Sequence, residues 1–141
     1  MHKIVSINIG GRGYATVYSI TEINSEEEYV ILPSEHYQSP ITRIGYEQEK
    51  YVDNRSEYER WKDEYYYSYY PTLSEVATEV SVSPNVKKIV IPSTITRISK
   101  TAFQNVKDMI FEIDKKNEHY KVEDNKIIEI SSGDIIWPYS E

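Results

Sequence analysis

Short runs of alternating hydrophobic and polar residues, which are typical of strands with one buried face, recur along this chain. Three such runs lie at residues 3–9, 14–18 and 29–32. The glycines within residues 10–13 can supply the positive φ angles of a tight turn between the first two runs, and Pro33 stops the third. The first third of the chain therefore predicts a β-hairpin followed by one further strand.

An internal repeat follows these runs. The tetrapeptide Ile-Thr-Arg-Ile at residues 41–44 recurs at residues 95–98, and each copy comes after a short apolar run that ends in Pro-Ser. Self-similarity of this kind indicates a repeat architecture. Each unit is predicted to be a strand, a proline turn and a second strand, and the first unit has the longer loop, residues 35–40. A closing hairpin with Gly133 in its turn is predicted over residues 126–137.

The β pattern breaks within residues 53–70. Ser56 and Glu59 have the spacing of a helix capping box, and Pro71 would end the helix that follows. The aromatic residues at helical spacing are Tyr58, Trp61 and Tyr65. We therefore expect a helix of about three turns in this segment.

Residues 86–105 resemble one complete repeat of the BspA-type leucine-rich repeats of bacterial surface proteins, a family in which Ile often takes the place of Leu. The resemblance includes Ala102 and Phe103, which match the Ala-Phe pair that plugs the core of that repeat. Residues 14–45 are similar to the entry segment of such arrays, and residues 111–137 are similar to their capping unit.

This resemblance implies an α+β, β-rich fold, namely a short leucine-rich-repeat solenoid capped by β-hairpins, with one helical insertion. We expect a single leucine-rich-repeat-like domain over residues 1–141. Its parts would be the N-terminal hairpin with the first repeat-like unit (1–45), the Tyr-rich helical insertion (46–79), and the second repeat with the C-terminal capping hairpin (80–141). Because the insertion has no counterpart in the family, the specificity of this chain is expected there.

Composition agrees with a β-rich folded chain, because Ile and Val greatly outnumber Leu and 14 tyrosines are present. The formal charge of −7 disfavours nucleic-acid binding, which relies on basic surfaces. The chain has no cysteine, which excludes a disulfide framework, a thiolate zinc site and a cysteine nucleophile. No apolar run approaches the ~20 residues that span a bilayer, so membrane insertion is not expected.

The start of the chain is too interrupted by polar side chains for a secretory signal, and no small-residue cleavage site follows. The family resemblance suggests a cell-surface or secreted protein, whereas the missing signal leaves a cytoplasmic location open. The sequence therefore assigns no compartment.

Three groups of residues could carry chemistry, and each has a simpler structural interpretation. Residues 10–18 resemble the phosphate-covering loop of protein kinases, but Arg12 stands at the second glycine position and the partner lysine is missing, so a hairpin turn is favoured. The three histidines lack the spacing of a metal site, and the carboxylates of the predicted helix are explained by a solvated face. We expect no catalytic residue, metal site or cofactor. An acidic hydrolase is kept as a third hypothesis because carboxylates are abundant.

Strand alternation divides the side chains of the repeat strands between two faces. The predicted inward set is Val30, Leu32, Ile89, Ile91, Phe111 and Ile113. The predicted outward set is Tyr29, Ile31, Lys88, Val90, Ile110 and Glu112. The outward set is a candidate partner-binding surface, to which we assign Tyr29, Ile31, Lys88 and Val90. On the inward side, we expect one buried cluster of Ile89, Ile91, Ile98 and Phe103.

The Tyr-rich insertion is the other candidate surface, with six tyrosines and Trp61 within residues 58–70. Tyrosine gives a large contact area at small entropic cost, which suits protein interfaces and sugar stacking. The partner-binding residues assigned here are Tyr66, Tyr67, Tyr69 and Tyr70. Packing of the insertion over an open sheet edge is the structural alternative.

These features together predict a non-enzymatic protein-recognition or adhesion module of the BspA-like type, which binds an unidentified protein partner through the two surfaces. The alternative function is glycan binding, with Trp61 and residues 65–70 as stacking platforms.

Overall fold

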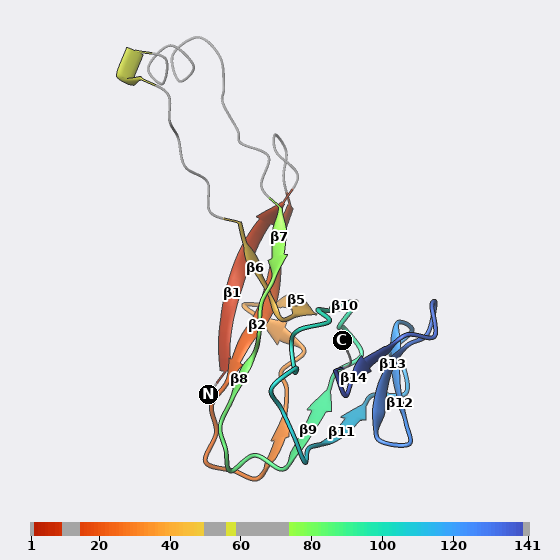
Figure 1. The fold of residues 1–141 in the computed structure, drawn as a ribbon. Coiled ribbons are helices and arrows are strands. Elements are labelled where there is room, and N and C mark those ends of the chain that lie inside the picture. Colours follow the sequence, from red (N-terminus) through yellow and green to blue (C-terminus); the bar gives the residue numbers. More distant parts are fainter. Residues whose placement is uncertain (1, 10–14, 50–55, 59–73, 140–141) are drawn as a thin grey trace.

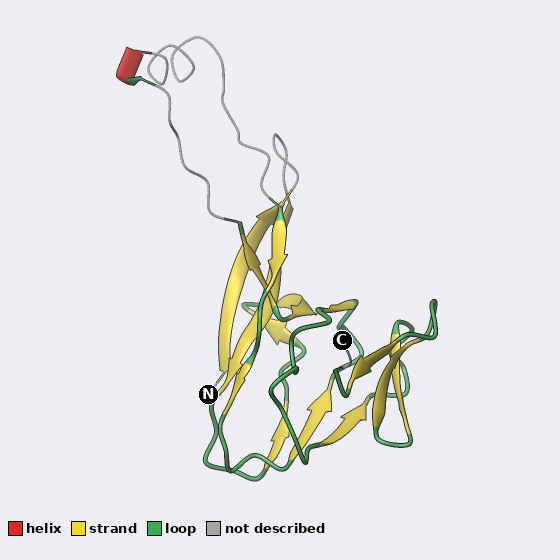
Figure 2. Ribbon diagram, in the orientation of Figure 1, coloured by secondary structure: helices red, strands yellow, loops and turns green. Residues whose placement is uncertain are grey.

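The computed structural model of this chain describes residues 2–9, 15–49, 56–58 and 74–139 (Figures 1 and 2). Its strands in chain order are β1 (His2–Ile9), β2 (Ala15–Ile23), β3 (Tyr29–Ile31), β4 (Glu35–His36), β5 (Ser39–Ile44), β6 (Tyr46–Gln48), β7 (Glu75–Ala77), β8 (Ser81–Val82), β9 (Lys88–Ile91), β10 (Arg97–Ile98), β11 (Ile110–Ile113), β12 (Tyr120–Glu123), β13 (Lys126–Glu129) and β14 (Ile135–Trp137). They form four sheets of six, three, three and two strands.

The expected solenoid with a helical insertion is wrong, because the protein is nearly all β and its main sheet curls into a half-barrel. In that six-stranded sheet the order is β1-β2-β5-β10, with β4 added to β5 and β8 added to β2. β2 has three partners, since it pairs with β1 on one side and with β5 and then β8 along its length. Register shifts at Lys3/Ile4 and at Tyr18/Ser19 bend these ladders. Irregularities of this kind, such as β-bulges, increase the local twist of a sheet. The main sheet accordingly curls, and it is not extended by further repeats.

The two copies of the internal repeat lie side by side in parallel. The first strands of the two copies, β3 and β9, are neighbours in the three-stranded sheet, where Tyr29 pairs with Lys88. Their second strands, β5 and β10, are neighbours in the half-barrel, where Arg43 pairs with Arg97. The expected unit of strand, proline turn and second strand is therefore confirmed for β3 with β5 and for β9 with β10. The opening hairpin of β1 and β2 and the closing hairpin of β13 and β14 are confirmed as well.

The insertion departs from the expectation at both of its ends. Tyr46–Gln48 and Glu75–Ala77 pair as the antiparallel strands β6 and β7, and β6 lies beside β1 and β2 of the half-barrel (Figure 1). Most of the expected helix falls on residues 50–55 and 59–73, which lie outside the described residues. Within the described part, only Glu57 and Tyr58 have helical geometry, and no helix there is long and apolar enough to cross a membrane.

One core joins the half-barrel to the two three-stranded sheets. The expected cluster of Ile89, Ile91, Ile98 and Phe103 is confirmed, because all four belong to this core and are at most 3% exposed. A row of aromatic contacts, one tilted and one edge-to-face, extends the core toward the C-terminal sheet, with ring centroids 4.8 Å apart between Phe103 and Phe111 and also between Phe111 and Trp137. Burial of these rings fixes the C-terminal sheet against β9 and β11.

Candidate binding surface

The sheet of β3, β9 and β11 has an inner face in the core and an outer face toward solvent. The inner side chains behave as predicted, since Val30, Ile89 and Phe111 are at most 4% exposed. The register places the outer side chains in two adjacent rows, Tyr29 with Lys88 and Ile110, and Ile31 with Val90 and Glu112. We call these six residues the outer face. Tyr29, Ile31 and Ile110 are 51%, 64% and 55% exposed, so the apolar part of this face is open.

Lys88 lies at the middle of the outer face and is held there by two neighbours. Its ammonium nitrogen is 2.8 Å from a carboxylate oxygen of Glu112 and 5.1 Å from the ring centroid of Tyr29. The hydrogen bond to Glu112 raises the pKa of Lys88 above the usual value for a lysine. Lys88 is therefore a charged group that orients the Tyr29 ring, and it is not suited to act as a base.

A hollow of about 590 Å³ continues the outer face toward the C-terminal sheet. Its lining includes Val90 and Glu112 from the outer face together with Lys121, Val122 and Ile130. Ile130 is 46% exposed, and it adds an apolar side chain to the far wall. The outer face and this hollow thus form one continuous surface with apolar side chains between charged ones.

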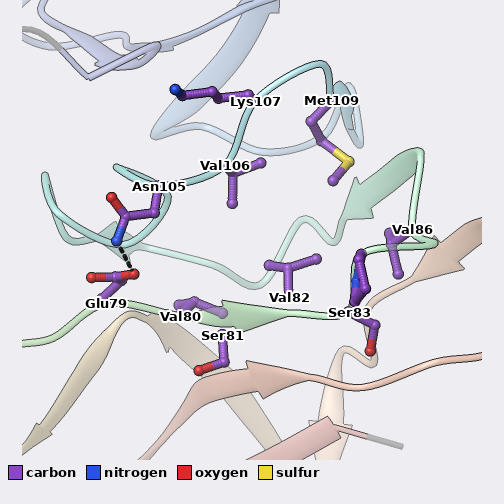
Figure 3. Close-up of a pocket in the computed structure, with 11 residues that line it drawn as sticks. Glu79, Val80, Ser81, Val82, Ser83, Val86, Asn105, Val106, Lys107 and Met109 are labelled. Atoms are coloured by element: carbon purple, nitrogen blue, oxygen red, sulfur yellow. Dashed lines mark hydrogen bonds between the residues drawn. The ribbon is translucent and has the colours of Figure 1, made fainter.

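A second hollow, of about 420 Å³, lies between β8 and the loop that leads to β11 (Figure 3). Val82, Val86 and Met109 give it apolar walls. Its two ionisable lining residues are Glu79 and Lys107, and the Glu79 carboxylate accepts hydrogen bonds from the side-chain amides of Gln104 and Asn105. Glu79 is therefore held by neutral donors and has no acid–base partner within this hollow.

An ionic cluster ties the β6–β7 hairpin to the half-barrel. The Glu75 carboxylate lies between the repeat-related Arg43 and Arg97, with 3.0 Å from Arg43 Nε to Glu75 Oε2, and the Arg97 guanidinium is 4.8 Å from the ring centroid of Tyr46. Arg43 also donates to Thr96 Oγ1 at 2.7 Å. Desolvation of the phenol raises the pKa of Tyr46. All these charges have partners, so we interpret the cluster as structural.

An aromatic group formed by Tyr18 of β2 with His36 and Tyr37 of the β4–β5 hairpin has no clear signal in the sequence. The Tyr18 and His36 rings are 5.1 Å apart, and the His36 and Tyr37 rings are 4.3 Å apart. Tyr37 and Gln38 form the turn with φ angles of 48° and 67°, a conformation that a bulky residue rarely adopts. Sequence reasoning found only a longer loop at residues 35–40, because Tyr-Gln is not a typical pair for such a turn.

The structure brings together four of the eight assigned partner-binding residues, namely Tyr29, Ile31, Lys88 and Val90. The other four, Tyr66, Tyr67, Tyr69 and Tyr70, lie outside the described residues, as do Trp61 and the glycine turn of residues 10–13. Where the structure describes side chains, no group of three or more His, Cys, Asp or Glu residues could hold a metal ion.

Comparison with models of protein families, with curated proteins and with solved structures finds no match to this chain. The resemblance to BspA-type repeats therefore stays a prediction that rests on the sequence pattern alone.

Proposed function

We propose that this protein is a non-enzymatic recognition module that binds a protein partner through the outer face of β3, β9 and β11. The observation that supports it most is the contiguous exposure of Tyr29, Ile31 and Ile110 around Lys88 on paired strands. Single exposed apolar residues are common on proteins, whereas a contiguous group on one sheet indicates an interaction site.

The rigidity of the outer face supports the same proposal. Each outer residue alternates with a buried one along its strand. The buried side chains of Val30, Ile89 and Phe111 pack into the core and hold the three strands in place. The Tyr29 ring is further oriented by Lys88. A surface that is already ordered loses little conformational entropy when a partner binds.

The partners of the ionisable side chains near the two hollows favour recognition over catalysis. Glu112 is paired with Lys88, and Glu79 is held by two side-chain amides. A general acid–base mechanism needs groups that can exchange protons with a bound substrate, and these contacts restrict such exchange.

The proposal is tested by panning a phage-displayed library of random peptides against the immobilised protein. The recovered peptides are then titrated against the wild-type protein, the Ile31→Glu variant and the Ile135→Glu variant. Ile135 is 52% exposed on β14, away from the outer face, and is the matched control. We expect Ile31→Glu to weaken binding about tenfold or more, since a charge would be buried against an apolar contact, and Ile135→Glu to leave it unchanged. Peptides that bind all three proteins equally would contradict the proposal.

Glycan binding is a second candidate, which the aromatic group of the half-buried Tyr18 and His36 and the exposed Tyr37 favours. Tyr37 is 85% exposed, and its ring offers an open face on which a sugar ring can stack. The test is a glycan array probed with the wild-type protein and with the double variant Tyr37→Asn, Gln38→Gly. This pair suits the positive φ angles of the turn, so the variant should gain about 1 kcal/mol of stability while losing any glycan signal that depends on the ring.

A further inference from the structure

The sheet of β3, β9 and β11 leaves one of its two edges open. β3 is the terminal strand in the order β11-β9-β3. The N–H of Lys88 donates to the carbonyl of Glu28, and the N–H of Leu32 donates to the carbonyl of Val90. In a parallel ladder, alternate residues of a strand bond to the same neighbour. The N–H and C=O groups of Tyr29 and Ile31 therefore point away from β9, toward the open side.

The opposite edge of the same sheet is closed by a side chain. Asn125, in the turn between β12 and β13, accepts a hydrogen bond from the Phe111 N–H at 3.3 Å and donates one to the carbonyl of Met109 at 2.9 Å. No described residue gives comparable cover to Tyr29 or Ile31. The protein thus caps the β11 edge and leaves the β3 edge able to accept another strand.

The surroundings of the open edge specify the chemistry of an added strand. The exposed side chains of Tyr29 and Ile31 can contact apolar residues at alternate positions of a neighbouring strand. At the beginning of β3 stand Glu26, Glu27 and Glu28, all exposed, and none of them forms an ion pair with another described residue. The turn that holds them is ordered, because the Glu27 N–H donates to Ser25 Oγ at 3.0 Å.

We propose that the β3 edge binds an extended segment of a partner protein as an added strand, with apolar residues at alternate positions and Lys or Arg residues beside Glu26–Glu28. This inference rests on the proposed function and specifies how the partner is held. Charge complementarity selects this occupant over a second copy of the chain, because two copies would each bring a charge of −7 and an exposed acidic run, without an ion pair to the described residues, to the same edge.

The experiment uses the peptides recovered by the panning described above and three variants of the full chain. Ile31→Pro removes the outward N–H without touching the ladder to β9, because the Ile31 N–H faces the open side, and an edge strand tolerates proline there. Ile31→Ala removes the side chain but keeps the N–H, and is the matched control. The third variant replaces Glu26, Glu27 and Glu28 by Gln. Hydrogen exchange of individual amides in the wild-type protein, measured by NMR with and without peptide, reports on the edge directly.

If a strand is added, peptide binding protects the Tyr29 and Ile31 amides from exchange. Ile31→Pro then weakens binding about tenfold beyond Ile31→Ala, since one interstrand hydrogen bond is lost and its partner is left unsatisfied. The triple Gln variant lowers affinity roughly threefold at low salt, and the recovered peptides share alternating apolar positions with Lys or Arg at one end.

Two other results would overturn the inference. In the first, the peptides depend on the Ile31 side chain, but they bind Ile31→Pro and Ile31→Ala with equal affinity and leave the Tyr29 and Ile31 amides unprotected. This result would show that the peptides bind the outer face without adding a strand. The proposed function would then hold, and the inference of strand addition would fail. A wild-type protein that dimerises through β3, with Ile31→Pro dissociating the dimer, would show that a second copy is the occupant. If Ile31→Pro fails to fold, the exchange measurement on the wild-type protein decides alone.

Discussion

Replacement of Gly45 should lower the stability of the protein for two reasons that can be tested separately. Its φ angle is +79°, and a Cβ atom there would lie 2.5 Å from Ser99 Oγ and 2.6 Å from Ala102 Cβ. We predict that Gly45→Ala lowers the free energy of unfolding by about 2–4 kcal/mol, measured by urea denaturation. Gly133 is the control, because its φ is +77° with nothing within 4 Å of the added Cβ, so that Gly133→Ala should cost only the backbone strain, ~1 kcal/mol. Equal losses in the two variants would rule out the steric clash.

Phe103 is the aromatic residue that joins the second repeat unit to the C-terminal sheet. It is 2% exposed, and its ring contacts that of Phe111 in a tilted arrangement. Phe103→Ala should therefore lower the free energy of unfolding by about 3–5 kcal/mol, through lost burial and the cavity left behind. Chemical denaturation measures the loss, with the half-exposed Ile110→Ala as a control that should change it by less than about 1 kcal/mol. A comparably small loss for Phe103→Ala would be inconsistent with its place in the core.

Among the secondary-structure elements, the β6–β7 pair is linked to the half-barrel by an ion pair of the Glu75 carboxylate. The Glu75 side chain is 8% exposed between Arg43, which is 17% exposed, and the more open Arg97. Glu75→Gln would leave the Arg43 guanidinium without its counter-charge, so we expect a loss of about 1–3 kcal/mol in urea denaturation. Glu47→Gln, at an exposed position of the same hairpin, should have almost no effect.

A double-mutant cycle between Glu75→Gln and Arg43→Met tests the cause of that loss. The two residues interact directly, so their effects on the free energy of unfolding should be non-additive by about 1 kcal/mol or more. Additive effects would mean that the hairpin is held by its packing, with no energetic contribution from this ion pair.

For the molecule as a whole, the structure predicts a loss of stability in alkali. Desolvation by burial raises the pKa of Tyr120 and that of Tyr46 above the usual value for a tyrosine. A folded-state pKa that is higher than the unfolded one means that the folded protein holds the proton more tightly. The resulting stabilisation is complete below the unfolded pKa near 10, and it is lost as the pH rises through the folded value.

Melting temperatures measured from neutral pH to above pH 10 test this prediction in the wild-type protein and in Tyr120→Phe. The hydroxyl oxygen of Tyr120 accepts the Ile98 N–H at 2.9 Å, so the variant should lose about 1 kcal/mol at neutral pH. Above pH 10 its melting temperature should fall less steeply than that of the wild type, because one buried phenol no longer ionises. Tyr139→Phe, at a residue that is 41% exposed, is the control and should follow the wild type. Parallel curves for wild type and Tyr120→Phe would exclude Tyr120 as a cause of alkaline unfolding.

Local patterns in the sequence are sufficient to predict much of the strand structure of this protein. Alternation places Val30, Ile89 and Phe111 inside and Tyr29, Ile31 and Ile110 outside, because strand geometry sends successive side chains to opposite faces whatever the neighbouring strand is. The repeated tetrapeptide likewise predicts that two similar units lie together, and Arg43 does pair with Arg97. Turn-forming residues and the alternation of buried and exposed positions each depend on a few consecutive residues, so they can be recognised in the sequence.

The curl of the main sheet and the open edge depend on contacts between distant segments. β2 meets β1, β5 and β8 through register shifts that no short sequence pattern marks, and the ends of the insertion pair as β6 and β7 across more than twenty-five intervening residues. The β3 edge is a candidate strand-binding site because nothing in the described structure covers it, whereas Asn125 reaches from the C-terminal sheet to cap β11. Which edge is capped is set by long-range packing, and a sequence pattern that reports only local preference cannot specify it.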